Sequence, residues 1–117
     1  MAIDLTKLKA LELPSKEITA EVMGEAQTVK ITAYGDDISL CMTDISDNFP
    51  TDGELRIRKL LLVECAGMTE EDAQLYISCD GKGSAEVLKE IFALTDEFDK
   101  SRKAAREDAK KKSAAGA

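Results

Sequence analysis

The spacing of apolar residues changes along this 117-residue chain, and the change limits the fold to a small sheet followed by helices. Apolar and polar residues alternate in ITAEVMG (18–24) and in TVKITAY (28–34), which predicts two half-buried strands joined by a turn around Gly24-Glu25-Ala26. From residue 54 onwards apolar residues recur at helical spacing. We therefore expect an α+β fold, with a small N-terminal antiparallel β-hairpin or meander followed by three helices.

Helix-start and helix-stop signals divide the second half of the chain into those three helices. Thr51 and Glu54 have the spacing of a capping box before ELRIRKLLLVECAG (54–67), which is apolar nearly all round and should be a buried helix ended by its glycine. Thr69 precedes the acidic start of a short helix, EEDAQLYIS. After a break at DGKG, we expect Ser84 to cap a last helix that carries one broad apolar stripe. The stripe consists of Val87, Leu88, Ile91, Phe92, Leu94, Thr95 and Phe98.

Charge is distributed unevenly along the chain. The net charge is -7, but residues 99–117 hold seven basic and three acidic side chains, which gives them +4. The remaining nine basic and 20 acidic side chains give residues 1–98 a charge of -11. We divide the chain into one globular domain (1–98) and a basic tail (99–117). The tail should be helical at first and disordered at its end, because it has helix-forming residues but no apolar stripe.

Three leucines near the N-terminus are candidate partner contacts. Leu5, Leu8 and Leu11 recur at a spacing of three in a short helix, for which Asp4 can serve as the N-cap and Pro14 as the stop. So short a helix is unstable alone. It therefore needs a surface to lie on, either its own domain or a neighbouring molecule.

Further candidate contacts lie at the other end of the domain. Phe98 is the last residue of the apolar stripe and stands beside the charged tail. The tail carries Lys110, Lys111 and Lys112, and its charge suits contact with an acidic neighbouring subunit. It has no aromatic residue to stack on bases, and the acidic domain would repel a phosphate backbone, so we expect no nucleic-acid partner.

The stretch AYGDDISL (33–40) resembles the Gly-Asp-Asp turn of viral RNA polymerases, whose paired carboxylates hold divalent cations. A two-metal site also needs a third carboxylate and a nucleotide-binding face, and this chain is too short for a polymerase palm with its fingers. Glycine and aspartate are in any case common in tight turns. We interpret Asp36 and Asp37 as a turn after the second strand, followed by a third strand or a helix start in ISLCM (38–42) and by a loop over 43–54.

The sequence lacks the usual side chains of an active site. It has no histidine, and its three cysteines (Cys41, Cys65 and Cys79) are widely spaced among apolar neighbours, so we expect buried, unreactive thiols. The segment CDGKGSAEVLKE fits neither a phosphate-binding loop nor an EF-hand. We expect no catalytic residue, metal or cofactor, and an enzyme is the least favoured class.

Membrane and export signals are also missing. No apolar run approaches the roughly 18 residues that a membrane-spanning helix requires, and the N-terminus has no signal-peptide pattern. The sequence therefore predicts a protein of a reducing cytoplasm without a membrane partner.

The order of these elements resembles that of the tail assembly chaperones of long-tailed bacteriophages. The resemblance covers residues 5–98 and rests on order and character, with no invariant catalytic motif. It includes the leucine-bearing start ending in Pro14, the strand pair EITAEVMGEAQTVKITAYG, the helix LRIRKLLLVECAG, the acidic helix start MTEEDAQLYIS, and SAEVLKEIFALTDEF after DGKG.

This resemblance implies a homo-oligomer that binds the tape measure protein while the tail tube protein polymerises in the host cytoplasm, and that is absent from the mature virion. It also implies a longer form made by ribosomal frameshifting. Lys110, Lys111 and Lys112 imply an adenine-rich codon run on which ribosomes slip, although cations at a helix end explain the same run. Two other classes stay open: a minor tail or head-tail joining component retained in the virion, and a small bacterial adaptor that binds a partner helix.

Overall fold

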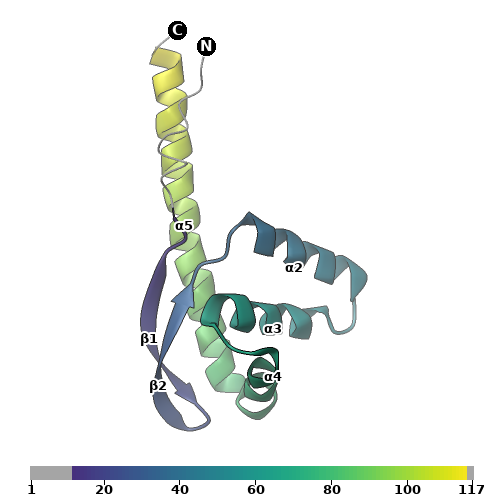
Figure 1. Ribbon diagram of the computed structural model, residues 1–117. Helices are drawn as coiled ribbons and strands as arrows, with labels where there is room; N and C mark the ends of the chain where they lie inside the picture. The colour runs from purple at the N-terminus through teal and green to yellow at the C-terminus, as the bar shows by residue number, and fades with distance from the viewer. Residues whose placement is uncertain (1–11, 116–117) are drawn as a thin grey trace.

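The protein has an α+β fold in which a two-stranded hairpin precedes the helices (Figure 1). The structure is a computed structural model that describes residues 12–115. The described elements are, in order, β1 (Ser15–Val22), β2 (Glu25–Thr32), α2 (Asp36–Asn48), α3 (Gly53–Ala66), α4 (Glu70–Cys79) and α5 (Gly81–Ala115). The α+β class is as predicted, but the described part of the chain holds four helices where the sequence predicted three after the strands.

The hairpin places its apolar residues on one face. β1 and β2 pair antiparallel with Ile18 opposite Val29, and directly opposite residues share a face of the sheet. Ala20 and Ile31 are buried on that face, and Ile18 and Val29 pack beside them against the core. The alternation in the sequence therefore predicted both the strands and the face that they bury.

A two-residue turn, Met23-Gly24, joins the strands. Both residues have positive φ, +56° at Met23 and +85° at Gly24, as the tight turns of twisted hairpins require. Glu25 and Ala26, which the sequence placed in the turn, are instead the first residues of β2. Two residues in the left-handed region are enough to reverse the chain, so the strand resumes earlier than predicted.

Helix α2 corrects the prediction for the Gly-Asp-Asp stretch. Asp36 and Asp37 form the first turn of a helix after Gly35. The same helix contains residues 38–42, for which the sequence left a third strand or a helix start open, and the first part of the predicted loop. Acidic residues suit the positive end of the helix dipole. Ile38, Met42 and Ile45 recur at helical spacing and α2 packs on α3, so tertiary contact outweighs the turn-forming composition.

Local sequence signals predicted the end of α3 and the start of α4 correctly, but they predicted the start of α3 incorrectly. Gly67 ends α3 with φ +70°, and the Thr69 hydroxyl accepts a hydrogen bond from the amide of Asp72 at the start of α4 (3.1 Å). The predicted capping box of Thr51 is wrong, because the N-cap of α3 is Asp52.

Asp80 joins α4 to α5 and begins the last helix. It is the residue that follows α4, and its carboxylate accepts a hydrogen bond from the amide of Gly83 (2.9 Å) in the first turn of α5. The predicted cap, Ser84, lies inside the helix and donates from its hydroxyl to the carbonyl of Gly81 (3.1 Å). The DGKG segment is therefore the start of the helix rather than a break before it. The Asp80 cap offsets the low helix propensity of the two glycines.

The core lies where the hairpin, α3, α4 and α5 meet. α5 supplies five side chains of the buried cluster, and the stripe predicted from its sequence is buried except for Phe92, which is 40% exposed. The buried cluster consists of Ala20, Ile31, Ala33, Leu61, Leu62, Cys65, Ala73, Tyr76, Val87, Leu88, Ile91, Leu94 and Phe98. Helix α5 continues to Ala115 and extends past the other described elements (Figure 1).

The tip of the hairpin is fixed to the start of α5. The carboxylate of Asp80 accepts a hydrogen bond from the amide of Met23 (2.9 Å), and the hydroxyl of Tyr76 donates to the carbonyl of Glu21 (2.8 Å). A Cβ atom added at Gly83 would clash with that same carbonyl oxygen. The backbone of the hairpin and the first turn of α5 therefore approach as closely as only glycine permits.

Replacing Gly83 by alanine tests this close approach. We expect Gly83→Ala to lower the free energy of unfolding by about 1 to 3 kcal/mol, because the new methyl group must displace both the backbone carbonyl of Glu21 and the carboxylate of Asp80 that caps the helix. Gly81→Ala in the same turn is the matched control, since nothing lies within 4 Å of its added Cβ. Equal midpoints of chemical denaturation for the two variants would contradict this account.

Candidate protein-docking groove

An apolar groove runs between α3 and α5 and is closed at one side by the chain that links α2 to α3. Its volume is about 530 Å³. Its polar lining side chains are Ser46, Glu54, Arg58 and Lys89, and the other lining residues are apolar or glycine. The lining residues are Ser46, Phe49, Pro50, Gly53, Glu54, Ile57, Arg58, Leu61, Ala85, Leu88, Lys89 and Phe92.

Buried leucines form the floor of the groove and aromatic rings form part of its walls. Leu61 of α3 is fully buried and Leu88 of α5 is 5% exposed. Phe49 and Phe92 are 38% and 40% exposed, so each ring presents apolar surface to solvent at the groove. Exposed aromatic rings over an apolar floor are typical of surfaces that bind other proteins.

The corner between α2 and α3 holds Phe49 in place. The guanidinium of Arg56 lies 3.8 Å from the centre of the Phe49 ring, within the range of a cation–π contact. Gly53, the first residue of α3, is buried against α2, and a Cβ added there would lie in van der Waals contact with the carbonyl oxygen of Ile45 (3.4 Å). The wall of the groove is thus formed by a tight corner that the sequence had placed in a loop.

Phe92 is supported from behind by Tyr34. The two rings meet edge to face, with centroids 6.1 Å apart and planes at 89°. The amide of Tyr34 donates to the hydroxyl of Thr95 (3.2 Å), which itself donates to the carbonyl of Ile91 (2.9 Å). Burial raises the pKa of the Tyr34 hydroxyl, and the charge of Asp99 raises it further, so the ring stays neutral beside the groove.

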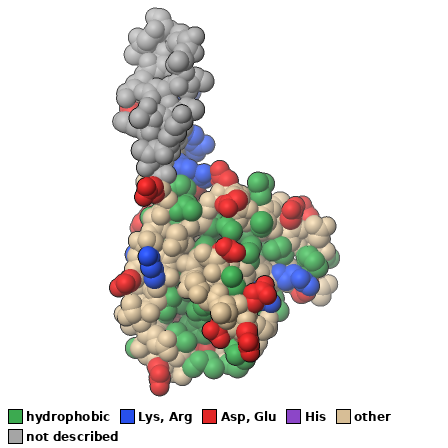
Figure 2. Space-filling model, in the orientation of Figure 1, with side chains coloured by type: hydrophobic (Ala, Val, Ile, Leu, Met, Phe, Trp, Pro, Cys, Tyr) green, Lys and Arg blue, Asp and Glu red, His purple; other side chains and the backbone are tan. Residues whose placement is uncertain are grey.

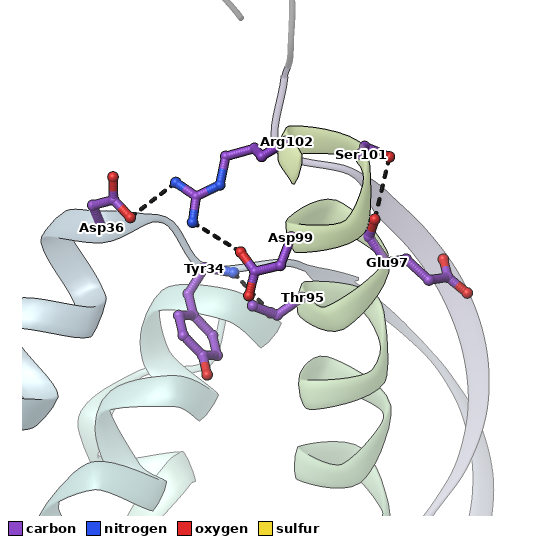
Figure 3. Close-up of polar contacts among 7 residues, drawn as sticks. All are labelled: Tyr34, Asp36, Thr95, Glu97, Asp99, Ser101 and Arg102. Carbon is purple, nitrogen blue, oxygen red and sulfur yellow. Dashed lines mark hydrogen bonds and ion pairs between the residues drawn. The ribbon is translucent and has the colours of Figure 1, made fainter. Parts of the chain in front are cut away.

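An arginine joins the start of α2 to α5 (Figure 3). Arg102 binds Asp36 (2.9 Å) and Asp99 (2.8 Å) and lies 5.0 Å from the centre of the Phe98 ring. The hydrogen bonds that Arg102 donates to Asp36 and Asp99 raise the pKa of Arg102, which remains charged. Because the Asp36 side chain is 79% exposed, such a pair contributes at most about 1 kcal/mol.

The residues that the sequence singled out do not line this groove. Phe98 is 8% exposed and belongs to the core, so it is not available as a direct contact. Lys110 is exposed on α5, and the side chains of Lys111 and Lys112 lie outside the described set. Leu5, Leu8 and Leu11 also lie outside the described residues. Asp36 and Asp37 begin α2 and face no groove lining.

Sequence reasoning missed the groove because its wall depends on an unpredicted helix. The α5 bank was present in the predicted stripe as Leu88 and Phe92, but both were assigned to the core. The visible signal was the width of that stripe, which is broader than one packing interface needs. Phe49 and Pro50 looked like ordinary loop residues.

The cysteines differ from the prediction of three buried thiols. Cys65 is buried in the core, whereas Cys41 and Cys79 are exposed. Among residues 12–115, no group of three histidine, cysteine, aspartate or glutamate side chains is placed to hold a metal ion. The same part of the chain has no helix that is both long enough and apolar enough to cross a membrane.

Comparison with known proteins finds no match: no family model, no curated protein and no solved structure matches this chain. The functional argument therefore depends on the sequence and on the geometry of the described residues.

Thiol labelling tests the environments of the cysteines. Burial and the charge of Glu64 raise the pKa of Cys65 to about 11, so at about pH 8 its thiol is protonated as well as inaccessible. We expect Cys41 and Cys79 to react with an alkylating reagent at least about tenfold faster than Cys65. Intact mass at successive times measures this, and all three should react alike in denaturant. A native chain that takes up three labels at one rate contradicts the burial of Cys65.

Stability should fall in alkaline solution. The pKa of Cys65 is raised from 9.0 to about 11 and that of Tyr76 from 10.0 to about 12, so the unfolded chain loses these protons first. Their contribution is complete below about pH 9 and is lost as the pH rises through 11 and 12. The denaturation midpoint should drop less between about pH 8 and 11 in Cys65→Ala than in the unsubstituted chain. An equal drop in both would show that Cys65 does not contribute.

Proposed function

We propose that this protein is a tail assembly chaperone of a long-tailed bacteriophage and that it binds an apolar helical segment of the tape measure protein in the groove between α3 and α5. The observation that carries the proposal is the groove itself, an apolar floor with two half-exposed aromatic rings on an acidic domain. The resemblance of residues 5–98 to this family, in the order and character of the elements, supports the same function.

The surface around the groove suits a chaperone. Acidic side chains are more frequent than basic ones on the face in Figure 2, and apolar side chains lie among them. Excess negative charge keeps a protein in solution while an apolar patch remains exposed. Binding through this patch would cover the apolar stripe of a tape measure helix and lower the concentration of free, aggregation-prone chain in the host cytoplasm.

The end of α5 offers a second contact in the proposed complex. Lys100, Lys103, Arg106 and Lys110 are exposed on the C-terminal part of α5. In a homo-oligomer, the basic end of α5 in one copy would attract the acidic domain of a neighbouring copy. A frameshifted longer form would extend the same helix end towards the tail tube protein.

Co-expression with the tape measure protein of the same genome tests the function. We expect the full chain to raise the amount of soluble tape measure protein and to co-purify with it. Ala85→Trp, which fills the groove from its exposed α5 bank, should reduce capture roughly fivefold or more. Ala104→Trp is the matched control on an exposed position of the same helix that does not line the groove. If both variants capture as much tape measure protein as the unsubstituted chain, the groove is not the binding site.

Mass spectrometry separates the chaperone from the other structural roles. A chaperone should be absent from purified virions, whereas a minor tail or head-tail joining component should be present. Intact mass of the products of the native gene with its downstream DNA should show a minor longer form that shares this N-terminus. Abundant protein in the virion would overturn the chaperone assignment.

A further inference from the structure

We propose that the groove selects a helix whose apolar stripe is flanked by an acidic side chain, and that Lys89 is the residue that recognises this acid. The inference rests on the proposed function, because it names the chemistry of the partner that the same groove takes. It adds a specificity-determining residue on α5 and predicts that the side chain beside the apolar stripe of the partner helix is negatively charged.

The shape of the groove fits a third helix. Residues 54, 57, 58 and 61 of α3 and residues 85, 88, 89 and 92 of α5 line its two banks, each set at the spacing i, i+3, i+4, i+7. That spacing is one face of a helix over two turns. A helix laid between two such faces packs its side chains into both, as amphipathic helices do in the grooves of their partner proteins.

The polar groups lie at the edges of the groove, which favours a helix as the ligand rather than a small polar molecule. Small-molecule sites have a few polar groups that converge inside the cavity. Here the buried floor is leucine, and the charged side chains Glu54, Arg58 and Lys89 are all exposed. A ligand with an apolar centre and charged edges, such as an amphipathic helix, matches this arrangement.

Lys89 is the cation at the groove that is open to a new partner. Arg58, the other cation in the lining, is paired with Glu54 one turn earlier on α3. Glu90, next to Lys89, is paired with Lys16 of β1 (3.3 Å). Within residues 12–115, Lys89 itself has no ion pair and no hydrogen bond from its side chain, to Glu86 or to any other residue.

Two electrostatic effects oppose each other at this site, so a measured preference for an acidic or a basic partner helix shows which effect is stronger. The charge of -11 on residues 1–98 favours a basic partner at long range. At physiological ionic strength that field is screened beyond about 8 Å, whereas an acid at the α5 bank would lie in direct contact with Lys89. We expect the contact to decide, so the preferred helix carries an acidic flank.

Selection from a displayed library tests the preference. The library consists of amphipathic helices with a fixed leucine stripe, in which the positions beside the stripe are Glu, Lys or Gln. The full-length protein should enrich Glu over Lys at one flank by about two- to fivefold, the range of an exposed ion pair. Lys89→Glu should reverse the preference to Lys. Lys82→Glu, at an exposed position of α5 away from the groove, is the charge-matched control and should leave it unchanged.

Each other outcome overturns the inference. It fails if the protein enriches Lys or neither charge, or if the preference for Glu survives Lys89→Glu. It also fails if the selected helices bind Ala85→Trp as well as they bind the unsubstituted chain, because they then bind outside the groove. Failure here is distinguishable from failure of the proposed function, since capture of the tape measure protein is measured separately and does not depend on the sign of the flanking charge.

Discussion

The contact between the hairpin tip and the first turn of α5 fixes the rest of the structure. Asp80 accepts hydrogen bonds from the amides of both Met23 and Gly83, so one carboxylate supports the hairpin turn and caps the long helix. The hydroxyl of Tyr76 holds the adjacent carbonyl of Glu21. A two-stranded hairpin is marginal alone, so this attachment is what allows it to cover the core. With the hairpin placed at one end of α5, its buried face meets α5 along the strands and leaves another face of the helix for α3.

Helix α5 consequently serves two surfaces at once. Val87, Ile91 and Leu94 are buried in the core, whereas Ala85, Lys89 and Phe92 line the groove. Because the two sets come from one helix, a change in core packing that rotates α5 also moves a groove bank. The apolar stripe of α5 is wider than the core alone needs, and its edge forms the bank of the groove.

The sequence predicted the parts of the fold that depend on local periodicity and missed those that depend on tertiary contact. Alternation identified both strands and their buried face, and the 3.6-residue period identified the core face of α5. Helix α2 was missed because aspartate, serine and asparagine favour turns, whereas the helix is stabilised by packing on α3 and by Ile38 and Met42 against the core. The groove was missed with it, since its wall is the α2–α3 corner. The exposed Cys41 was misjudged for the same reason, because the segment expected to be a third strand or a helix start lies in a helix with no buried residue.

The walls of the groove differ in how firmly they are held, and this bears on how it binds. The α3 and α5 banks rest on fully or nearly fully buried leucines, and moving them would open the core. Helix α2 buries no residue completely and is joined to α5 by the exposed pair of Arg102 and Asp36. An exposed pair of this kind contributes little, so α2 is held mainly by its packing on α3 and by Ile38 and Met42, which pack against the core. In the complex that we propose, the two buried banks would contact a partner helix, and the α2–α3 corner would close the groove on one side.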